Sequence, residues 1–321
     1  MDLQLLLDNL TNPALLFFFL GLFAVQIKSD LEIPDSSSKF ISFYLLFAIG
    51  FKGGQELSHS TFDMEILWSM LLGVGLAIVV PIYTYFILRR KLSVQNSGAI
   101  AAAYGSISAV TFVTAVSFLE MQQISFGGHM IAIMALMEAP SIIVGVMLMS
   151  LFSDKPQSGD STKHAIRHAV TNGSVVLILG SLVIGFLASD AQAEGIEPFT
   201  TDIFKGFLSV FLLDMGITSG KKLSSFMKYG WFAFLFAIII PIINGCLIAI
   251  FSGLITESVG NRLLFSILAA SASYIAVPAA MRLAAPQANP SLYIPMALAI
   301  TFPFNISFGF PLYLSVIYAF A

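Results

Sequence analysis

The stretch from Ser266 to Met281, S-I-L-A-A-S-A-S-Y-I-A-V-P-A-A-M, lies in an apolar region long enough to cross a bilayer. Its middle carries Ser271, Ser273 and Tyr274, followed by Pro278. A proline inside a membrane helix frees a backbone carbonyl, which a small hydroxyl side chain can satisfy. Because irregular backbone is tolerated only inside protein or beside a water-filled cavity, this stretch predicts a broken membrane span.

A second stretch of the same kind runs from Ala101 to Ala115, A-A-A-Y-G-S-I-S-A-V-T-F-V-T-A. A shift of 165 residues superposes Ser106–Ser108 on Ser271–Ser273. Interrupted spans in corresponding positions of two halves are the best sequence indication of a transporter's binding site. We therefore expect two broken helices that cross near the bilayer centre.

The composition is that of an integral membrane protein. Hydrophobic residues make up 57% and charged residues 10% of the chain, and the mean hydropathy is +0.90. The longest basic run is only Arg89-Arg90-Lys91, so nucleic acid is not expected as a partner. Cys246 is the single cysteine, which excludes an internal disulfide. No Lys or Arg precedes the first apolar run near Pro13, so we interpret that run as a membrane span and not as a secretory signal.

Apolar segments of the length that a membrane span needs, about 20 residues, recur along the whole chain. The sequence predicts ten such segments: 13–28, 38–55, 64–88, 97–119, 128–152, 168–188, 203–220, 228–254, 260–281 and 291–320. The expected fold class is therefore an all-α integral membrane protein with about ten transmembrane helices.

The distribution of Lys and Arg agrees with this number of spans. With the N-terminus outside, 12 basic residues fall on the inner side, and Lys52, Lys205 and Arg262 fall on the outer side. Such an imbalance is what the positive-inside rule requires. We therefore expect a multi-pass protein of the bacterial inner membrane with both termini external. The inner residues are Lys28, Lys39, Arg89, Arg90, Lys91, Lys155, Lys163, Arg167, Lys221, Lys222, Lys228 and Arg282.

Weak internal matches recur in the same order in both halves, at shifts of 160 to 166 residues. Biased composition explains any one match, but their common order indicates a repeat. The pairs are Thr11-Asn12 with Thr171-Asn172, Ser29-Asp30 with Ser189-Asp190, Gly50 and Gly54 with Gly216 and Gly220, Ala77–Ile82 with Ala237–Ile242, and Met134–Leu136 with Met296–Leu298.

The odd number of spans in each half forces the two halves to run through the membrane in opposite directions. The sequence thus predicts a 5+5 inverted-topology repeat. Its first half is 1–152, a short cytoplasmic linker is 153–167, and the second half is 168–321.

Five hydroxyl residues cluster at equivalent places in the broken spans: Ser106, Ser108 and Thr111, with Ser271 and Ser273. The N-terminus of a half-helix presents free N–H groups and a partial positive charge, which suits a small anion. Hydroxyl oxygens and unwound carbonyls suit Na+. The alternative is that these small residues only allow helices to pack closely.

Few ionisable residues lie within the predicted spans, and each is a functional candidate because a buried charge is costly in a membrane. Glu138, ahead of Pro140, is expected to bind a cation or carry a proton, or else to satisfy carbonyls freed by the proline. Asp214 is a further candidate for ion coupling, nearer a helix end.

Thr301 and Asn305 flank Pro303 at the place in the second half that Glu138 and Pro140 hold in the first. They are expected either to complete the ion site or to cap a kink. Lys52, beside three glycines, is expected to attract an anion or to extend its ammonium group to the outer interface.

Catalytic and nucleotide-binding motifs do not occur in the sequence, so no enzyme activity is expected. No cofactor and no metal other than Na+ as coupling ion is expected.

Several stretches resemble the sodium-dependent bicarbonate transporter family over nearly the full length of the chain. They are A-I-G-F-K-G-G at 48–54, G-S-I-S-A-V-T at 105–111, Glu138-Ala-Pro140, S-A-S-Y-I-A-V-P-A at 271–279 and A-N-P-S-L-Y-I at 288–294. The last two, in this order, are the most specific to that family.

The resemblance implies a core domain and a gate domain, each built from both repeats, in a homotrimer whose core moves like an elevator. It also implies that the anion and Na+ bind between the crossing broken helices. Gly105, Ser106, Ser108, Ser271 and Ser273 match the family's site segments, and the last of these segments also contains Tyr274. A small PII-like regulatory protein is a further partner that the resemblance implies.

The chain departs from the pattern of bicarbonate-transporting members at five positions. Those members carry Asp where this chain has Tyr274, Ser at Ala276, Gly at Val277, Asp at Glu138 and Thr at Lys52. The linker is also short where some members carry a long hydrophilic insert.

The expected function is Na+-coupled import of bicarbonate or a similar small anion. One alternative keeps the fold but transports organic anions with Na+ or H+, as bile-acid transporters do. Another is a membrane sensor or scaffold that binds a PII-like regulator.

Overall fold

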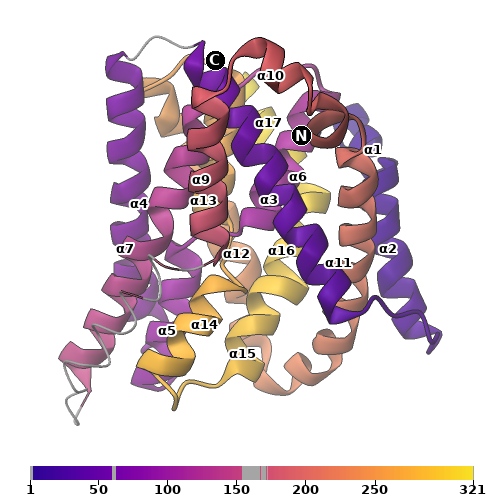
Figure 1. Ribbon diagram of the computed structural model, residues 1–321. Helices are drawn as coiled ribbons and strands as arrows, with labels where there is room; N and C mark the ends of the chain where they lie inside the picture. The colour runs from indigo at the N-terminus through magenta and orange to yellow at the C-terminus, as the bar shows by residue number, and fades with distance from the viewer. Residues whose placement is uncertain (1–2, 60–62, 154–166, 168–170, 172, 321) are drawn as a thin grey trace.

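A computed structural model describes residues 3–59, 63–153, 167, 171 and 173–320. All regular structure in these residues is helical, which confirms the predicted all-α class (Figure 1). The predicted linker, 153–167, lies outside the described residues except at its two ends.

Polar side chains mark where several helices of the first half begin. Asn12, Asp63 and Ser93 each accept a hydrogen bond from a backbone N–H of the first turn that follows. The helices of this half are α1 (Leu3–Leu10), α2 (Pro13–Gln26), α3 (Asp35–Ser58), α4 (Met64–Leu88), α5 (Val94–Gly105), α6 (Ala109–Met121) and α7 (His129–Phe152).

The second half ends in a proline-rich segment that alternates α-helical and π-helical turns. Because each proline removes a backbone donor, the regular bonding pattern shifts along this segment. The helices are α9 (Gly173–Leu187), α10 (Asp190–Glu194), α11 (Phe204–Phe226), α12 (Trp231–Phe251), α13 (Val259–Ala270), α14 (Ala276–Ala284), α15 (Pro290–Pro295), α16 (Phe302–Phe304) and α17 (Phe310–Ala319), with π-helical turns at Pro198–Asp202, Met296–Thr301 and Asn305–Gly309.

Among the described residues, six helical segments are long and apolar enough to cross a membrane: Met64–Leu88, Val94–Met121, His129–Phe152, Pro198–Leu223, Trp231–Leu254 and Pro290–Ala319. The α1–α2 pair, bent by 64°, would make a seventh. The other predicted segments coincide with α3, α9 and α13–α14, which do not meet the same test. The chain is thus a multi-pass membrane protein, and ten crossings stay a prediction.

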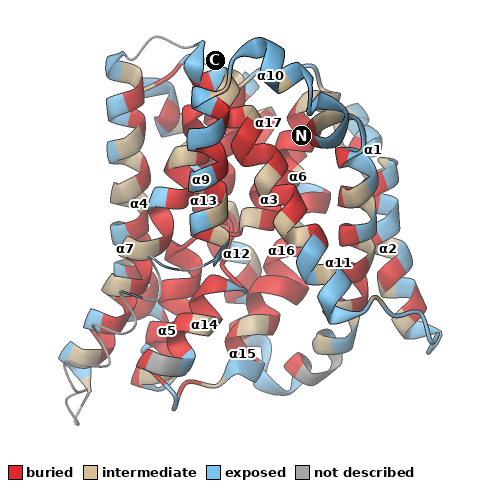
Figure 2. Ribbon diagram, viewed as in Figure 1, coloured by how far each residue is buried: buried red, intermediate tan, exposed pale blue. Residues whose placement is uncertain are grey.

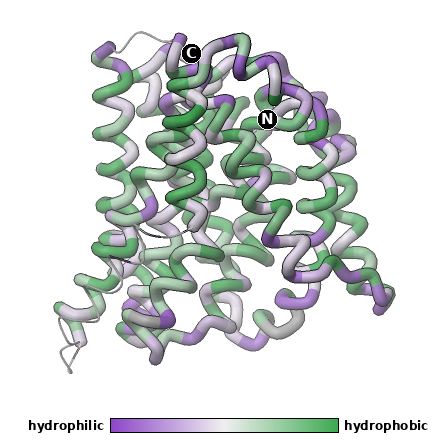
Figure 3. The backbone as a smooth tube through the Cα atoms, in the orientation of Figure 1, coloured by the Kyte–Doolittle hydropathy of each residue, from purple (hydrophilic) through white to green (hydrophobic). Residues whose placement is uncertain are grey.

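Hydrophilic residues gather toward the two ends of the bundle, and hydrophobic residues follow the helices between them (Figure 3). Both ends of the chain lie at the same end of the bundle, as an even number of crossings requires (Figure 1).

The broken helix α5–α6 lies at the centre of the bundle. Of its most apolar window 89% is buried, against 39% for α4 and for α12, whose outward faces carry large exposed apolar side chains (Figure 2). The central position fits the requirement that irregular backbone be surrounded by protein.

The most extensive helix pairings join the two halves of the chain: α3 packs along α9, and α2 packs along α11. Glycines permit both approaches. A Cβ added at Gly185 of α9 would lie 2.1 Å from the carbonyl oxygen of Phe51, and one at Gly216 of α11 would lie 2.1 Å from that of Phe18. Such contacts are possible only without a side chain, as in other closely packed membrane helices.

Gly185→Ala should destabilise the protein because the new methyl group forces α3 and α9 apart. We expect a lower apparent melting temperature, equivalent to about 1–3 kcal/mol of overpacking. Gly180→Ala on the same helix is the matched control, since nothing lies within 4 Å of its added carbon. The control should melt at the wild-type temperature or slightly above it. Equal losses in both variants would contradict the contact as the cause.

Candidate functional site

Both predicted broken spans are broken in the structure. The first break lies between α5 and α6, and the second between α13 and α14. The helices on the N-terminal side end in the same way: Ser106 and Ser271 are extended, and their N–H groups bond to the carbonyls of Ala102 and Ile267 at 3.0 and 2.9 Å. The 165-residue shift that relates the two serines in sequence therefore relates them in geometry as well.

The two breaks are joined by hydrogen bonds. The Ser108 N–H donates to the Ser271 hydroxyl at 3.1 Å, and the Ser273 N–H donates to the Ala103 carbonyl at 2.8 Å. Each broken helix thus accepts a hydrogen bond from a backbone N–H of the other, and these two direct bonds join the helices at the crossing.

A serine also supports the start of the helix on the C-terminal side of each break: Ser108 is the N-cap of α6, and Ser273 lies two residues before Ile275, the N-cap of α14. The Ser108 hydroxyl accepts a hydrogen bond from the Thr111 N–H at 3.2 Å, which begins α6, and the Ser273 hydroxyl accepts one from the Val277 N–H at 3.3 Å, which begins α14. Thr111 does not line the cavity described below, and its part in the site is this backbone N–H.

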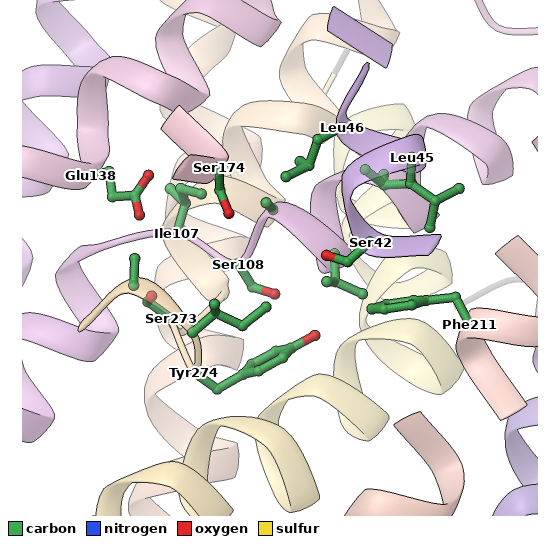
Figure 4. A pocket seen from close by; sticks show the side chains of 15 residues that line it. Ser42, Leu45, Leu46, Ile107, Ser108, Glu138, Ser174, Phe211, Ser273 and Tyr274 are labelled. Atoms are coloured by element: carbon green, nitrogen blue, oxygen red, sulfur yellow. The ribbon is translucent and has the colours of Figure 1, made fainter. Parts of the chain in front are cut away.

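A cavity of about 40 Å³ lies against both caps. Figure 4 shows Ser108, Ser273, Tyr274 and Glu138 around it, and all four were expected in the site. The cavity also has residues that the sequence did not indicate, from α3, α9 and α11: Ser42, Leu45, Leu46, Ser174 and Phe211.

Glu138 brings a carboxyl group to this cavity from α7. Its residue is 6% exposed, and no described residue forms a hydrogen bond or ion pair with it. The hydroxyl of the neighbouring Ser141 donates its hydrogen bond to the Ala102 carbonyl, at 3.0 Å, and not to Glu138. An unpaired buried carboxyl group in a membrane is costly, so it requires a bound cation or a proton.

Asp214 does not reach the central cavity. It lies on α11 in a wider vestibule of about 520 Å³, where its carboxylate accepts a hydrogen bond from the Ser38 hydroxyl. Asp35 and Lys39 of α3 line the same vestibule. These residues stand at the end of α3 that the charge pattern assigns to the inner side of the membrane.

Thr301 and Asn305 support the crossing and do not line the cavity. The Thr301 hydroxyl lies 2.7 Å from the Ala237 carbonyl and 2.7 Å from the Tyr104 hydroxyl. The Asn305 amide donates to the Ala270 carbonyl at 2.9 Å, near the end of α13. Both residues hold broken-helix ends in place.

Gly105 and Ser106 are fully enclosed and also lie outside the cavity lining. A Cβ at Gly105 would lie 2.2 Å from the Pro81 ring, so close helix packing explains this glycine. The Ser106 hydroxyl is buried and has no hydrogen-bond partner among the described residues.

Lys52 lies in a third cavity, of about 180 Å³, near the opposite end of α3. Its ammonium nitrogen is 2.7 Å from Oε1 of Glu120 near the C-terminal end of α6. The side chains are 35% and 28% exposed, so water screens the pair. Lys52 therefore joins α3 to α6 and does not contact the central cavity.

Replacing Lys52 by Glu should destabilise the protein, because it brings a second carboxylate against Glu120. We expect a modest loss, about 1 kcal/mol, since the pair is partly exposed. The charge-swapped variant Lys52→Glu with Glu120→Lys should regain the wild-type apparent melting temperature. Failure of the swap to recover stability would show that the ion pair contributes nothing measurable.

A family model of the Na+-dependent bicarbonate transporter superfamily matches residues 13–318, nearly the whole chain. No individual curated protein matches the chain. A transporter family is consistent with a sequence that carries no catalytic motif, and the protein is a transporter and not an enzyme. The chain therefore belongs to the Na+-dependent bicarbonate transporter superfamily.

Proposed function

We propose that this protein imports bicarbonate or a similar small anion together with Na+, and that both bind in the central cavity. The observation that carries the proposal is the meeting of two helix N-termini, each with a first-turn N–H bonded to a serine hydroxyl, with one unpaired carboxyl group around a cavity of about 40 Å³.

The capped ends supply the anion's partners. Each helix N-terminus presents a partial positive charge of about half an elementary charge. The hydroxyl oxygens of Ser108 and Ser273 accept hydrogen bonds from backbone N–H groups, so each hydroxyl hydrogen can donate to an anion, that of Ser108 in exchange for the Tyr274 hydroxyl. Helix ends of this kind bind anions without a cationic side chain.

The carboxyl group of Glu138 supplies the coupling. An anion bound alone beside an ionised Glu138 would be repelled, by about 4 kcal/mol for charges 4 Å apart at an effective dielectric constant of 20. A Na+ ion in the same cavity reverses that repulsion. Anion binding thus depends on the cation, which is the thermodynamic requirement for symport.

The size of the cavity favours a small anion over the organic-anion alternative. A site that holds one water needs about 10–15 Å³ on this measure, so 40 Å³ accommodates a few small groups. Pockets for larger organic ligands have volumes of about 300–1,000 Å³.

We further propose that the chain is an inverted repeat with a gate domain and a core domain. The α3–α9 pair and the α2–α11 pair each join one helix of each half. The shifts that relate the halves in sequence place α2 on α9 and α3 on α11, so they turn one pair into the other. The contact of Gly50 with the Ile178 carbonyl likewise corresponds to that of Gly216 with the Phe18 carbonyl. These four helices would form the gate of an elevator, and the helices around the crossing would form its core, in the homotrimer expected from the family.

The test of function is uptake of labelled bicarbonate into proteoliposomes with an inward Na+ gradient. An equal K+ gradient and protein-free vesicles are the controls. We expect uptake that Na+ stimulates. Vesicles that contain folded protein and take up no bicarbonate in either gradient would direct the search to another small anion.

Ser108→Ala and Ser273→Ala should each weaken anion binding about tenfold or more, because each removes a donor to a charged ligand. Each should also cost about 1 kcal/mol of stability through the lost cap. The anion concentration for half-maximal uptake measures the first effect. Ser209→Ala is the control, since its hydroxyl only contacts the Lys205 carbonyl of its own helix on an exposed face. Wild-type affinity in both site variants would contradict this anion site.

Glu138→Gln should abolish the response of uptake to Na+, a loss of at least about tenfold in the stimulated rate. The amide keeps the shape of the side chain but not its charge. If the variant retains the wild-type Na+ dependence, Glu138 has a structural role. If the wild-type protein instead responds to an inward proton gradient without Na+, H+ coupling replaces Na+ coupling in the proposal.

A further inference from the structure

The central cavity and the vestibule adjoin at a ring of side chains that line both spaces. The two spaces share their lining at this ring: Ser42, Ser174, Phe211, Tyr274 and Ile275. The volumes on its two sides differ more than tenfold, about 40 Å³ in the cavity and about 520 Å³ in the vestibule. An anion that moves between the central site and the vestibule must therefore pass this ring, which we call the neck.

Tyr274 supplies the largest movable part of the neck. It lies in the second break, so its backbone belongs to no helix, and Figure 4 shows its ring extending from the break below Ser108 toward Phe211. Phe211 stands opposite on α11, whereas Ile275 is already 47% exposed.

The Tyr274 side chain is enclosed but has few polar contacts. The residue is 8% exposed, and its hydroxyl contacts the Met215 sulfur at 3.9 Å and the Ser108 hydroxyl. A thioether sulfur is a weak acceptor, so the Ser108 hydroxyl is the main polar group that opposes a rotation of the ring. The ring has an edge contact with Phe302, with centroids 6.0 Å apart. Such a contact contributes about 1 kcal/mol, so it permits a minor rotated state.

We propose that the Tyr274 ring is the inner gate of the central cavity and the size filter of the carrier. In its observed position the ring separates the small site from the vestibule, and it passes an anion only when it swings aside. Since the cavity behind it holds only a few heavy atoms, the filter admits inorganic anions and excludes carboxylates that carry an alkyl chain. This inference rests on the proposed transport of a small anion and adds the side chain that sets its size limit.

The test that does not depend on transport is the labelling rate of single cysteines, in a background that carries Cys246→Ser. Ala109→Cys reports on the central cavity and Thr218→Cys on the vestibule, because each position lines one space and not the other. The probe is a small methanethiosulfonate reagent, applied to the purified full-length protein.

With Tyr274 present, we expect the Ala109 cysteine to react about tenfold or more slowly than the Thr218 cysteine, since the open state of a gate is a minor one. Tyr274→Ala should abolish that difference, whereas Tyr274→Phe should keep it, because the ring and not the hydroxyl closes the neck. Tyr274→Leu, which keeps part of the apolar contact, serves if the alanine variant does not fold. Equal rates at both cysteines in the presence of Tyr274, or an unchanged difference in Tyr274→Ala and Tyr274→Leu, would overturn the proposal.

Competition with labelled bicarbonate tests the filter itself. Butyrate should not compete in the wild-type protein but should compete in Tyr274→Ala or Tyr274→Leu. Competition by butyrate in the wild-type protein, or in none of these variants, would overturn the size limit. If the wild-type protein takes up no bicarbonate while the labelling difference holds, the transport proposal fails and the gate stands.

Discussion

The backbone of two interrupted helices must be satisfied in a place that water does not reach, and the rest of the structure depends on how this is done. An unpaired backbone group in such surroundings costs several kcal/mol. The two breaks meet this requirement mutually, through the Ser108 N–H on the Ser271 hydroxyl and the Ser273 N–H on the Ala103 carbonyl. Neither break would be stable alone, which explains why the helices around them are the most buried of the bundle.

The same constraint accounts for the site. Once two helices must stop at one place, their continuations begin there, and each beginning needs a cap. Serine is the residue that caps a helix and still keeps a hydrogen to donate. The serine hydroxyls that we propose as binding groups are therefore also structural groups of the crossing. The carboxyl group of Glu138 is different, because no described residue satisfies it. Its burial without a partner opposes stability, and the proposed binding of Na+ would account for it.

The bounds of the helices could be predicted from the sequence better than the packing of one helix against another. The segment 64–88 coincides with α4, and the segment 128–152 coincides with α7 to within a residue, because unbroken apolar runs determine both. Ser108 and Ser273 were also found, since two interrupted spans with the same shift are visible in the chain. The number of membrane crossings was not settled, since α3, α9 and α13 lack the length or apolar content of ordinary spans.

Residues that join the site from other helices could not be predicted. Ser42 and Phe211 line the cavity only because α3 and α11 pack beside the crossing, and a serine or phenylalanine in an apolar helix is too common to indicate this. Conversely, Asp214 and Thr301 were grouped with the ion site on polarity alone. Asp214 lies in the vestibule, and Thr301 contacts the Tyr104 hydroxyl near the end of α5. Which side of a helix faces the site depends on packing between segments distant in the chain, which periodicity does not encode.

Helix α3 lines the vestibule, the central cavity and the third cavity in turn. The order of these spaces along the helix indicates toward which side of the membrane the observed conformation is open. Its first turns line the open vestibule, Leu45 and Leu46 line the central cavity, and Lys52 lines the third cavity, where it pairs with Glu120. In the proposed alternating-access cycle the wide side is the open one, so the observed state would be the inward-facing form if both termini are external, as the charge pattern predicts. In the proposed elevator, α6 would move along α3 to reach the other form, and that movement would break the Lys52–Glu120 pair. Because a partly exposed pair contributes only about 0–1 kcal/mol, it can bias the two forms without locking either.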